Sequence, residues 1–208
     1  DKRKRPLAVG LEMFQHIEQS ILDAWVAKEL SEEEMRRAFA RNWSEDWYLY
    51  RDIFMYCRDR NIPMIGLNVP RSITRKVARK GFEALTPEEI GKLPPIVCRV
   101  DREYEAFLRR VLGDHGTDSG FRRFCEAQLV WDTAMAIYAL EYLKNHPERT
   151  VFVLCGMIHA WKKAAPEQAA RENAEVEQAV VQPALKGRWT PGSVSKEDAD
   201  YLILGLAE

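Results

Sequence analysis

The chain has 208 residues, of which 46% are hydrophobic and 30% are charged. This length suffices for one domain whose hydrophobic core needs no disulfide or structural metal. The 31 Lys and Arg against 32 Asp and Glu give a formal net charge of −1. That balance argues against a broad surface for nucleic acid or an anionic membrane, although it is compatible with a local basic face. No apolar run reaches the roughly 20 residues that span a bilayer, and the first residues do not form a signal peptide.

Three short apolar runs indicate the strands of a parallel sheet. Residues 6–12, 63–68 and 150–156 show little alternation of polar and apolar side chains, as expected for strands that are covered on both faces. Helical patterns separate the runs. We therefore expect an α/β fold, with a mostly parallel sheet flanked by helices in a single domain over residues 1–208.

Helices are predicted between the first two strands. Apolar residues at spacings of three and four indicate an amphipathic helix over 13–27. Ser31 and Glu34 form the pattern of a capping box that starts a second helix. Residues 46–60 indicate a third.

The second half of the chain is mainly helical. Pro70 fits the first position of a basic helix over 70–80. Residues 93–101 predict a loop because two adjacent prolines fit neither a helix interior nor a central strand. Helices are expected over 101–112 and 119–146, and the second is apolar nearly all round, so it should lie deep in the fold. Two weaker strand candidates follow at 176–183 and 199–206.

Polar residues follow the three strands, at the edge where an open parallel sheet binds its ligands. The first strand ends at Glu12, and the second ends at Asn68 with Arg71 just beyond it. The third leads to His159. We expect these four side chains to meet in one crevice. The alternatives are that Glu12 caps the following helix and that His159 is an ordinary polar residue at a helix start.

The long helix carries two polar residues in its apolar middle. Gln128 and Asp132 lie four residues apart, so they share one face. A buried carboxylate needs a partner, such as Arg71 or His159. Asp132 either belongs to a core network that fixes the helix against the sheet or holds an imidazole in one tautomer.

Several segments resemble, in order, the ChaN family of haem-binding uptake proteins, part of a superfamily with the Tiki, TraB and erythromycin-esterase-like proteins. These segments are 8–14, 67–71, 124–136, 151–161 and 198–206. The resemblance implies an α/β fold, bacterial origin, and haem or iron uptake at the cell envelope. It also implies a periplasmic protein or a membrane-anchored lipoprotein.

The chain departs from the family pattern at its start. The family begins with a strand that ends in Gly-Glu-x-His, and nothing here corresponds to it, so the first family strand is expected to be missing. Gly156 to His159 match the second Gly-x-x-His motif, and Glu12 matches the family glutamate. In the metalloprotease-like members both histidines and such acids hold the metal, so Glu12 and His159 would supply only part of a metal site.

Haem binding requires an apolar slot, an axial ligand and cations for the propionates. The candidate axial ligands are Tyr48, Tyr50, Tyr56, His115 and His159. Tyr48 and Tyr50 cannot face the same way on one helix. The alternative for each tyrosine is a half-buried packing residue. The candidate propionate partners, which are otherwise solvated charges, are Arg71, Arg75, Lys76, Lys162 and Lys163.

We expect a non-enzymatic haem-binding protein that uses the crevice, and its partners would be haem, a membrane receptor or transporter, and a second copy of the chain. The candidate haem contacts are Glu12, Asn68, Arg71, Asp132, His159, His115 and Tyr48. One alternative is a metal-dependent hydrolase that binds a divalent transition metal through Glu12 and His159. Another is an interaction module with a Trp and Tyr surface. The usual metalloprotease, dinucleotide, nucleotide and serine-hydrolase motifs are absent from the sequence.

Overall fold

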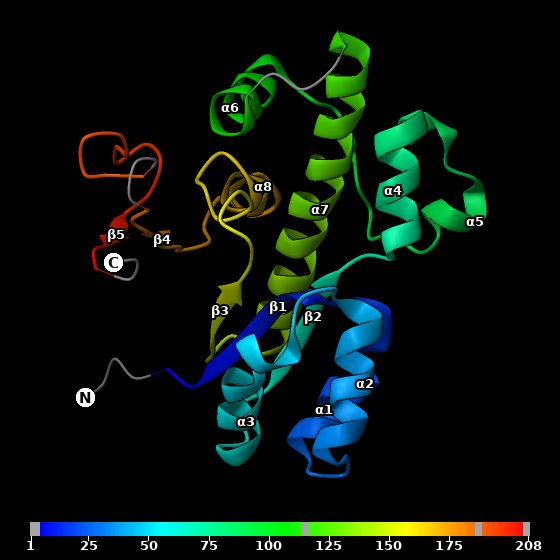
Figure 1. The fold of residues 1–208 in the computed structure, drawn as a ribbon, viewed down its shortest axis with the longest axis vertical. Coiled ribbons are helices and arrows are strands. Elements are labelled where there is room, and N and C mark those ends of the chain that lie inside the picture. The colour runs from blue at the N-terminus through cyan, green and yellow to red at the C-terminus, as the bar shows by residue number, and fades with distance from the viewer. Residues whose placement is uncertain (1–4, 114–116, 186–188, 206–208) are drawn as a thin grey trace. The chain divides into compact units, whose positions relative to one another are not determined.

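The computed structural model describes residues 5–113, 117–185 and 189–205. The chain divides into two compact units (Figure 1). Unit 1 consists of the residues up to Pro70 together with 137–155, and unit 2 consists of 71–136 and the residues from Gly156 onward.

The main sheet belongs to unit 1. Its strands are β1 (Leu7–Gln15), β2 (Met64–Asn68) and β3 (Thr150–Leu154). They are all parallel, in the order β2-β1-β3 (Figure 1). This arrangement confirms the prediction that the three apolar runs are parallel neighbours, and it confirms the α/β fold class. The central strand β1 is buried along most of its length.

The prediction that all three strands are covered on both faces is wrong for β3. The side chains of Phe152 and Val153 are 53% and 36% exposed, although successive residues of a strand point to opposite faces. Among the described residues β3 pairs only with β1, so it is an edge strand. An apolar run of residues indicates a strand, but it does not indicate how many strands pair with it.

Unit 1 also contains α1 (Gln19–Val26), α2 (Glu32–Asn42) and α3 (Arg51–Asp59), with 3-10 turns η1 (His16–Glu18) and η2 (Trp47–Leu49). The helix predicted over 13–27 starts late because β1 continues to Gln15. The helix predicted over 46–60 is interrupted at Tyr50, between η2 and α3. The capping box is confirmed, since Ser31 Oγ accepts from the amide of Glu34 and the Glu34 carboxylate accepts from the amide of Ser31 at 2.8 Å.

The helices of unit 2 include the three predicted over 70–80, 101–112 and 119–146, whereas the helix over 165–172 was not predicted. They are α4 (Arg71–Lys80), η3 (Phe82–Ala84), α5 (Pro87–Ile90), α6 (Arg102–Leu112), α7 (Asp118–Asn145), whose last turns belong to unit 1, and α8 (Ala165–Glu172). The segment 93–101 contains no helix or strand, as predicted. The middle of α7 is buried on nearly every side, as its composition indicated. None of the helices in the described parts of the chain is long and apolar enough to cross a bilayer.

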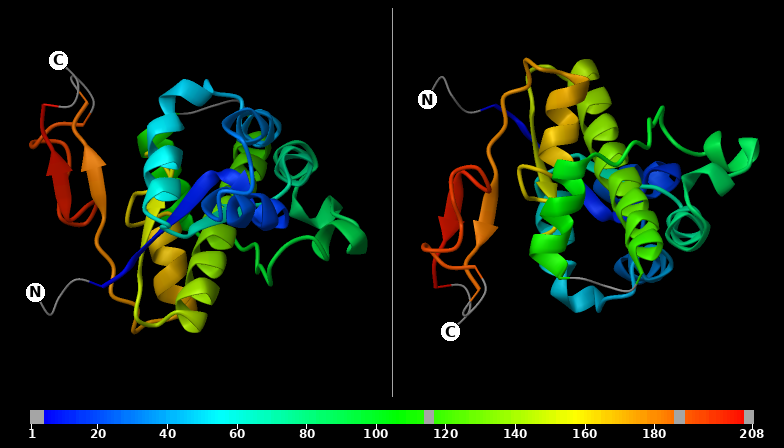
Figure 2. Two further views of the ribbon diagram at one scale, coloured as in Figure 1. Left: turned by 90° about the horizontal axis from the view of Figure 1, so that it is seen from below. Right: turned by 90° about the horizontal axis from the view of Figure 1, so that it is seen from above.

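The tail contains the two weaker strands. They are β4 (Val181–Pro183) and β5 (Tyr201–Ile203), each shorter than predicted. They pair in parallel with each other in a separate two-stranded sheet (Figure 2).

Candidate functional site

A buried carboxylate lies at the centre of a polar network in unit 2. Asp132 on α7 is 0% exposed. Tyr104 on α6 donates its hydroxyl to Oδ2 of Asp132 at 2.5 Å, and Nδ1 of His159 lies 2.7 Å from Oδ1. The contact between Asp132 and His159 that the sequence predicted is therefore present. Asp101 positions Tyr104 at the start of α6, because its carboxylate accepts from the Tyr104 amide at 2.8 Å.

The charges and burial in this network determine which groups donate its hydrogen bonds. Burial, and then the charge of Asp132, raises the pKa of Tyr104 well above its ordinary value, so the hydroxyl stays protonated and donates. A carboxylate only accepts hydrogen bonds, so Nδ1 of His159 is the donor of the second bond. In a neutral imidazole the acceptor nitrogen is then Nε2. Asp132 therefore holds the ring of His159 in one tautomer and one orientation.

His159 is held by its main chain and by an aromatic neighbour. Its amide donates to the carbonyl of Gly156 at 2.9 Å. The indole of Trp131 meets the imidazole edge to face, with ring centroids 5.7 Å apart. The side chain of His159 is 6% exposed. These contacts make His159 a rigid, enclosed imidazole.

Trp131 adds a donor next to this imidazole. Its indole Nε1 is buried and has no hydrogen-bond partner in the parts of the chain that the structure describes. A buried N–H is normally satisfied. The indole Nε1 of Trp161 is in the same situation, so this feature by itself does not mark a binding site.

Glu12 and Asn68 lie together in unit 1. The side-chain amide of Asn68 donates to the main-chain oxygen of Glu12 at 2.6 Å, and Asn68 Oδ1 accepts from the amide of Val69 at 2.8 Å. The amide of Asn68 therefore joins β1 to β2. The expectation that β1 ends at Glu12 is wrong, since the strand continues to Gln15. Glu12 is therefore not the cap of the following helix, and it is only 5% exposed.

Arg71 opens α4 in unit 2 and is partly exposed. Its main-chain oxygen accepts from the hydroxyl of Thr74 at 3.3 Å. The structure thus brings Glu12 to Asn68 in one unit and Asp132 to His159 in the other. That these groups share one crevice with Arg71 stays a prediction.

The candidate tyrosines differ in exposure. Tyr48 in η2 is 71% exposed, as is its neighbour Leu49. Tyr50 packs against Phe39, with ring centroids 5.3 Å apart, so the two tyrosines face different ways as predicted. Tyr56 on α3 is 50% exposed. His115 lies outside the described residues.

A guanidinium lies close to Tyr48. The Glu33 carboxylate, and to a smaller extent the Tyr48 phenol, raises the pKa of Arg36. Arg51 follows η2 directly, but it forms an ion pair with Glu32 at 2.5 Å. Arg36 is paired as well, with the Glu33 carboxylate at 2.8 Å, so both guanidinium groups beside the turn that carries Tyr48 already have carboxylate partners.

Three of the candidate propionate partners already have carboxylate partners. Lys76, Lys162 and Lys163 form ion pairs at 2.5, 2.6 and 2.9 Å. Arg75 forms no ion pair within the described ranges and is exposed. No group of three His, Cys, Asp or Glu that could hold a metal occurs within these ranges either.

Sequence reasoning missed Tyr104. It lies on the apolar stripe of α6 with Phe107, Leu108 and Val111, at the spacing of a buried helix face. A buried tyrosine hydroxyl usually finds an acceptor. That requirement, together with the need of the buried Asp132 carboxylate for hydrogen-bond donors, was the available signal.

Two solved structures are similar to this chain as a whole. The structure is similar to that titled "Cofacial heme binding to ChaN of Campylobacter jejuni", with a TM-score of 0.62 and 20% identity over 97% of this chain and 74% of that one. An erythromycin esterase, a point mutant of EreC in its open conformation, matches with a TM-score of 0.49 and 14% identity over 88% of this chain and 64% of that one. No curated protein matches the chain significantly.

The family model described as "Haem-binding uptake, Tiki superfamily, ChaN" matches residues 1–168. The match covers most of the chain and includes β1, β2, β3 and the Asp132–His159 pair. This chain therefore belongs to the ChaN family of haem-binding uptake proteins.

Proposed function

We propose that this chain binds haem in bacterial haem or iron uptake at the cell envelope, and that it delivers haem to a membrane receptor or transporter. The observation that carries the proposal is the match of a haem-binding family model to residues 1–168. The structural relative from Campylobacter jejuni is described as binding haem cofacially. The role requires an axial ligand on an apolar surface with cations nearby.

Tyr48 fits the requirements of an axial ligand best among the described candidates. Its side chain is 71% exposed on a short turn, while its amide is fixed by Asp46 at 3.0 Å. The exposed Leu49 would supply an apolar contact for a porphyrin face, and Arg36 would supply a cation for a propionate by exchanging its present partner, the Glu33 carboxylate. His159 fits less well because its ring is enclosed and Nδ1 faces Asp132.

The residues of this surface have distinct tasks. Haem iron, when bound, supplies a Lewis-acidic centre for a tyrosine oxygen. Tyr48 would provide that oxygen, and Arg36 would compensate the negative charge of a propionate. In a cofacial arrangement the surface around Tyr48 and Leu49 would face a second copy of the chain, so a homodimer is part of the proposal.

The test is a haemin titration of the apoprotein, followed by the Soret band. We expect saturable binding that Tyr48→Phe weakens by at least tenfold or shifts spectrally. Tyr201→Phe is the matched control, because Tyr201 is also exposed but is not a candidate ligand. If haemin saturates the wild type and both variants alike, the ligand is not Tyr48. If the wild type shows no saturable band, the haem proposal itself fails.

The second candidate function is a metal-dependent hydrolase that uses the predicted crevice of Glu12, Asn68, Arg71, Asp132 and His159. The observation that favours it is the buried Tyr104–Asp132–His159 network, because a carboxylate that orients an imidazole suits either a metal ligand or a general base. Calorimetric titration with Zn²⁺ or Mn²⁺ tests it. Stoichiometric binding that Glu12→Gln abolishes and the exposed-site control Glu29→Gln preserves would favour the hydrolase over haem.

A further inference from the structure

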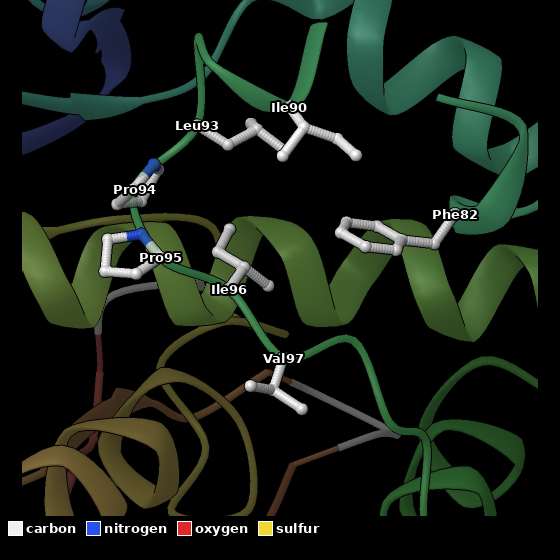
Figure 3. A pocket seen from close by; sticks show the side chains of 7 residues that line it. All are labelled: Phe82, Ile90, Leu93, Pro94, Pro95, Ile96 and Val97. Atoms are coloured by element: carbon white, nitrogen blue, oxygen red, sulfur yellow. The ribbon is translucent and has the colours of Figure 1, made fainter. Parts of the chain in front are cut away.

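An apolar groove of about 470 Å³ opens in unit 2, outside the polar network. It is lined by Phe82, Ile90, Leu93 and residues 94–97. Figure 3 shows Phe82, Ile90, Leu93 and Ile96 around a common space, with Val97 at its edge and the Val97 side chain directed away from it. Every lining residue is apolar. Phe82 and Leu93 also pack on the small core that contains Val77 of α4.

The chain segment that lines the groove is attached to α7 at both of its ends. The amide of Phe82 donates to the Glu126 carboxylate at 2.8 Å. The thiol of Cys98 donates to the main-chain oxygen of Glu126 at 3.7 Å. Between these points, Lys76 of α4 holds Glu89 of α5 at 2.5 Å. The segment 82–98 is therefore held in place before anything binds to it.

The rim of the groove exposes large apolar side chains. Val97 is 84% exposed and Ile90 is 47% exposed. The neighbouring Pro94 and Pro95 have no amide N–H. If this loop enters a less polar phase, it therefore leaves two fewer hydrogen-bond donors without a partner than a loop of the same length without proline. The loop thus combines outward apolar side chains with a low cost of desolvation.

Basic residues outnumber acidic ones in the segment that contains the groove, in contrast to the chain as a whole. Residues 71–99 contain seven Lys and Arg against three Glu, whereas the whole chain has a net charge of −1. Lys80, Lys92 and Arg99 lie within two residues of Phe82, Leu93 and Val97, respectively. Lys92 is paired with Glu88, but the described residues provide no ion-pair partner for Lys80 or Arg99. Lys80 and Arg99 are therefore basic residues close in sequence to the apolar residues of the groove.

We propose that this groove and its basic border dock on the surface of an anionic phospholipid bilayer. Ile90 and Val97 would enter the boundary between headgroups and acyl chains, while Lys80 and Arg99 would meet the phosphates. The charge complementarity selects an anionic lipid surface over a neutral apolar partner. None of these residues belongs to the turn that carries Tyr48 or to the Asp132 network, so the inference does not depend on haem.

The test is cosedimentation of the full chain with vesicles of phosphatidylcholine mixed with phosphatidylglycerol, and with vesicles of phosphatidylcholine alone. We expect binding to the anionic vesicles that weakens in roughly 0.5 M salt, where charge is strongly screened. Val97→Asp should weaken this binding by about tenfold, through the loss of apolar burial. Lys80→Gln and Arg99→Gln should each weaken it by about fivefold on the anionic vesicles.

The matched control is Val181→Asp, which changes an exposed valine of β4 in the same unit. Wild-type binding with this variant supports the proposal, provided that circular dichroism shows all variants folded. Equal losses for Val97→Asp and Val181→Asp would overturn it, as would equal binding to neutral vesicles. So would a concentration-dependent dimer in sedimentation velocity that Val97→Asp abolishes without any lipid, because the groove would then dock a second copy.

Discussion

Nδ1 of His159 lies 2.7 Å from Oδ1 of Asp132, in a site where both side chains are almost fully buried. A carboxylate in such surroundings is stable only when its oxygens are hydrogen-bonded. Tyr104 occupies the other oxygen, so the network joins α6, α7 and the segment after β3. The same bonds that stabilise unit 2 also fix the imidazole for any role that it has.

Tyr104→Phe should lower the free energy of unfolding by about 1–3 kcal/mol, because it leaves one oxygen of the buried Asp132 without its donor. Urea denaturation measures the change. Tyr201→Phe is the control, since that side chain is 64% exposed, and it should stay within about 0.5 kcal/mol of wild type. Equal small effects for the two variants would show that the Tyr104 hydrogen bond adds nothing to stability.

Ser31→Ala removes the side chain that caps α2. The Ser31 hydroxyl accepts from the Glu34 amide, and its loss should cost about 1 kcal/mol in the free energy of unfolding. Ser72→Ala is a matched change at an exposed position in the first turn of α4. We expect little effect from it, and a thermal or urea melt that ranks Ser72→Ala as the worse variant would contradict the capping role.

The strands of the main sheet could be predicted because their signal is local. Residues 6–12, 63–68 and 150–156 are apolar in composition, and the helices between them require parallel pairing. The exposure of Phe152 could not be predicted, since it depends on the absence of a second neighbour for β3 among the described residues. Likewise, β1 continues past Glu12, and Met13 and Phe14 are buried in one core cluster with residues of α1, α2 and α3.

The site was accessible from the sequence only in part. A carboxylate in an apolar helix needs a partner, and this physical rule named Arg71 or His159, of which His159 is in contact with Asp132. Tyr104 was not predicted to belong to the site, because a tyrosine on the apolar face of an amphipathic helix is equally consistent with core packing. The exposure of Tyr48 depends on the break at Tyr50, where a regular helix was expected.

Gly66→Ala should destabilise the chain by about 1–3 kcal/mol, as overpacking does. A Cβ at Gly66 would lie 2.8 Å from the main-chain oxygen of Gln15, and a backbone atom in a sheet cannot easily move away. Gly192→Ala is the control, because a Cβ at that position would have no heavy atom of the described residues within 4 Å. A denaturation midpoint that falls equally for both variants would rule out the steric account.

Alkaline pH should weaken the fold through two buried thiols. Burial raises the pKa of Cys57 to about 11, and burial, with a smaller contribution from Glu105, raises that of Cys125 to about 12, both from an ordinary value of 9.0. A pKa that is raised in the folded state means that the unfolded state loses its proton first. The stability that these thiols contribute is therefore complete below about pH 9 and is lost as pH rises through the folded pKa values.

Between about pH 9 and pH 10 each of these thiols should lower the free energy of unfolding by at most about 1.4 kcal/mol per pH unit. Urea denaturation under reducing conditions measures this slope. Cys125→Ala removes one of the two groups, so its slope in this range should be shallower than that of the wild type, even though its stability at neutral pH is lower. If the slope of the unfolding free energy against pH is the same in Cys125→Ala as in the wild type, the Cys125 thiol does not cause the loss of stability at alkaline pH. The substitution removes one titrating group and adds none.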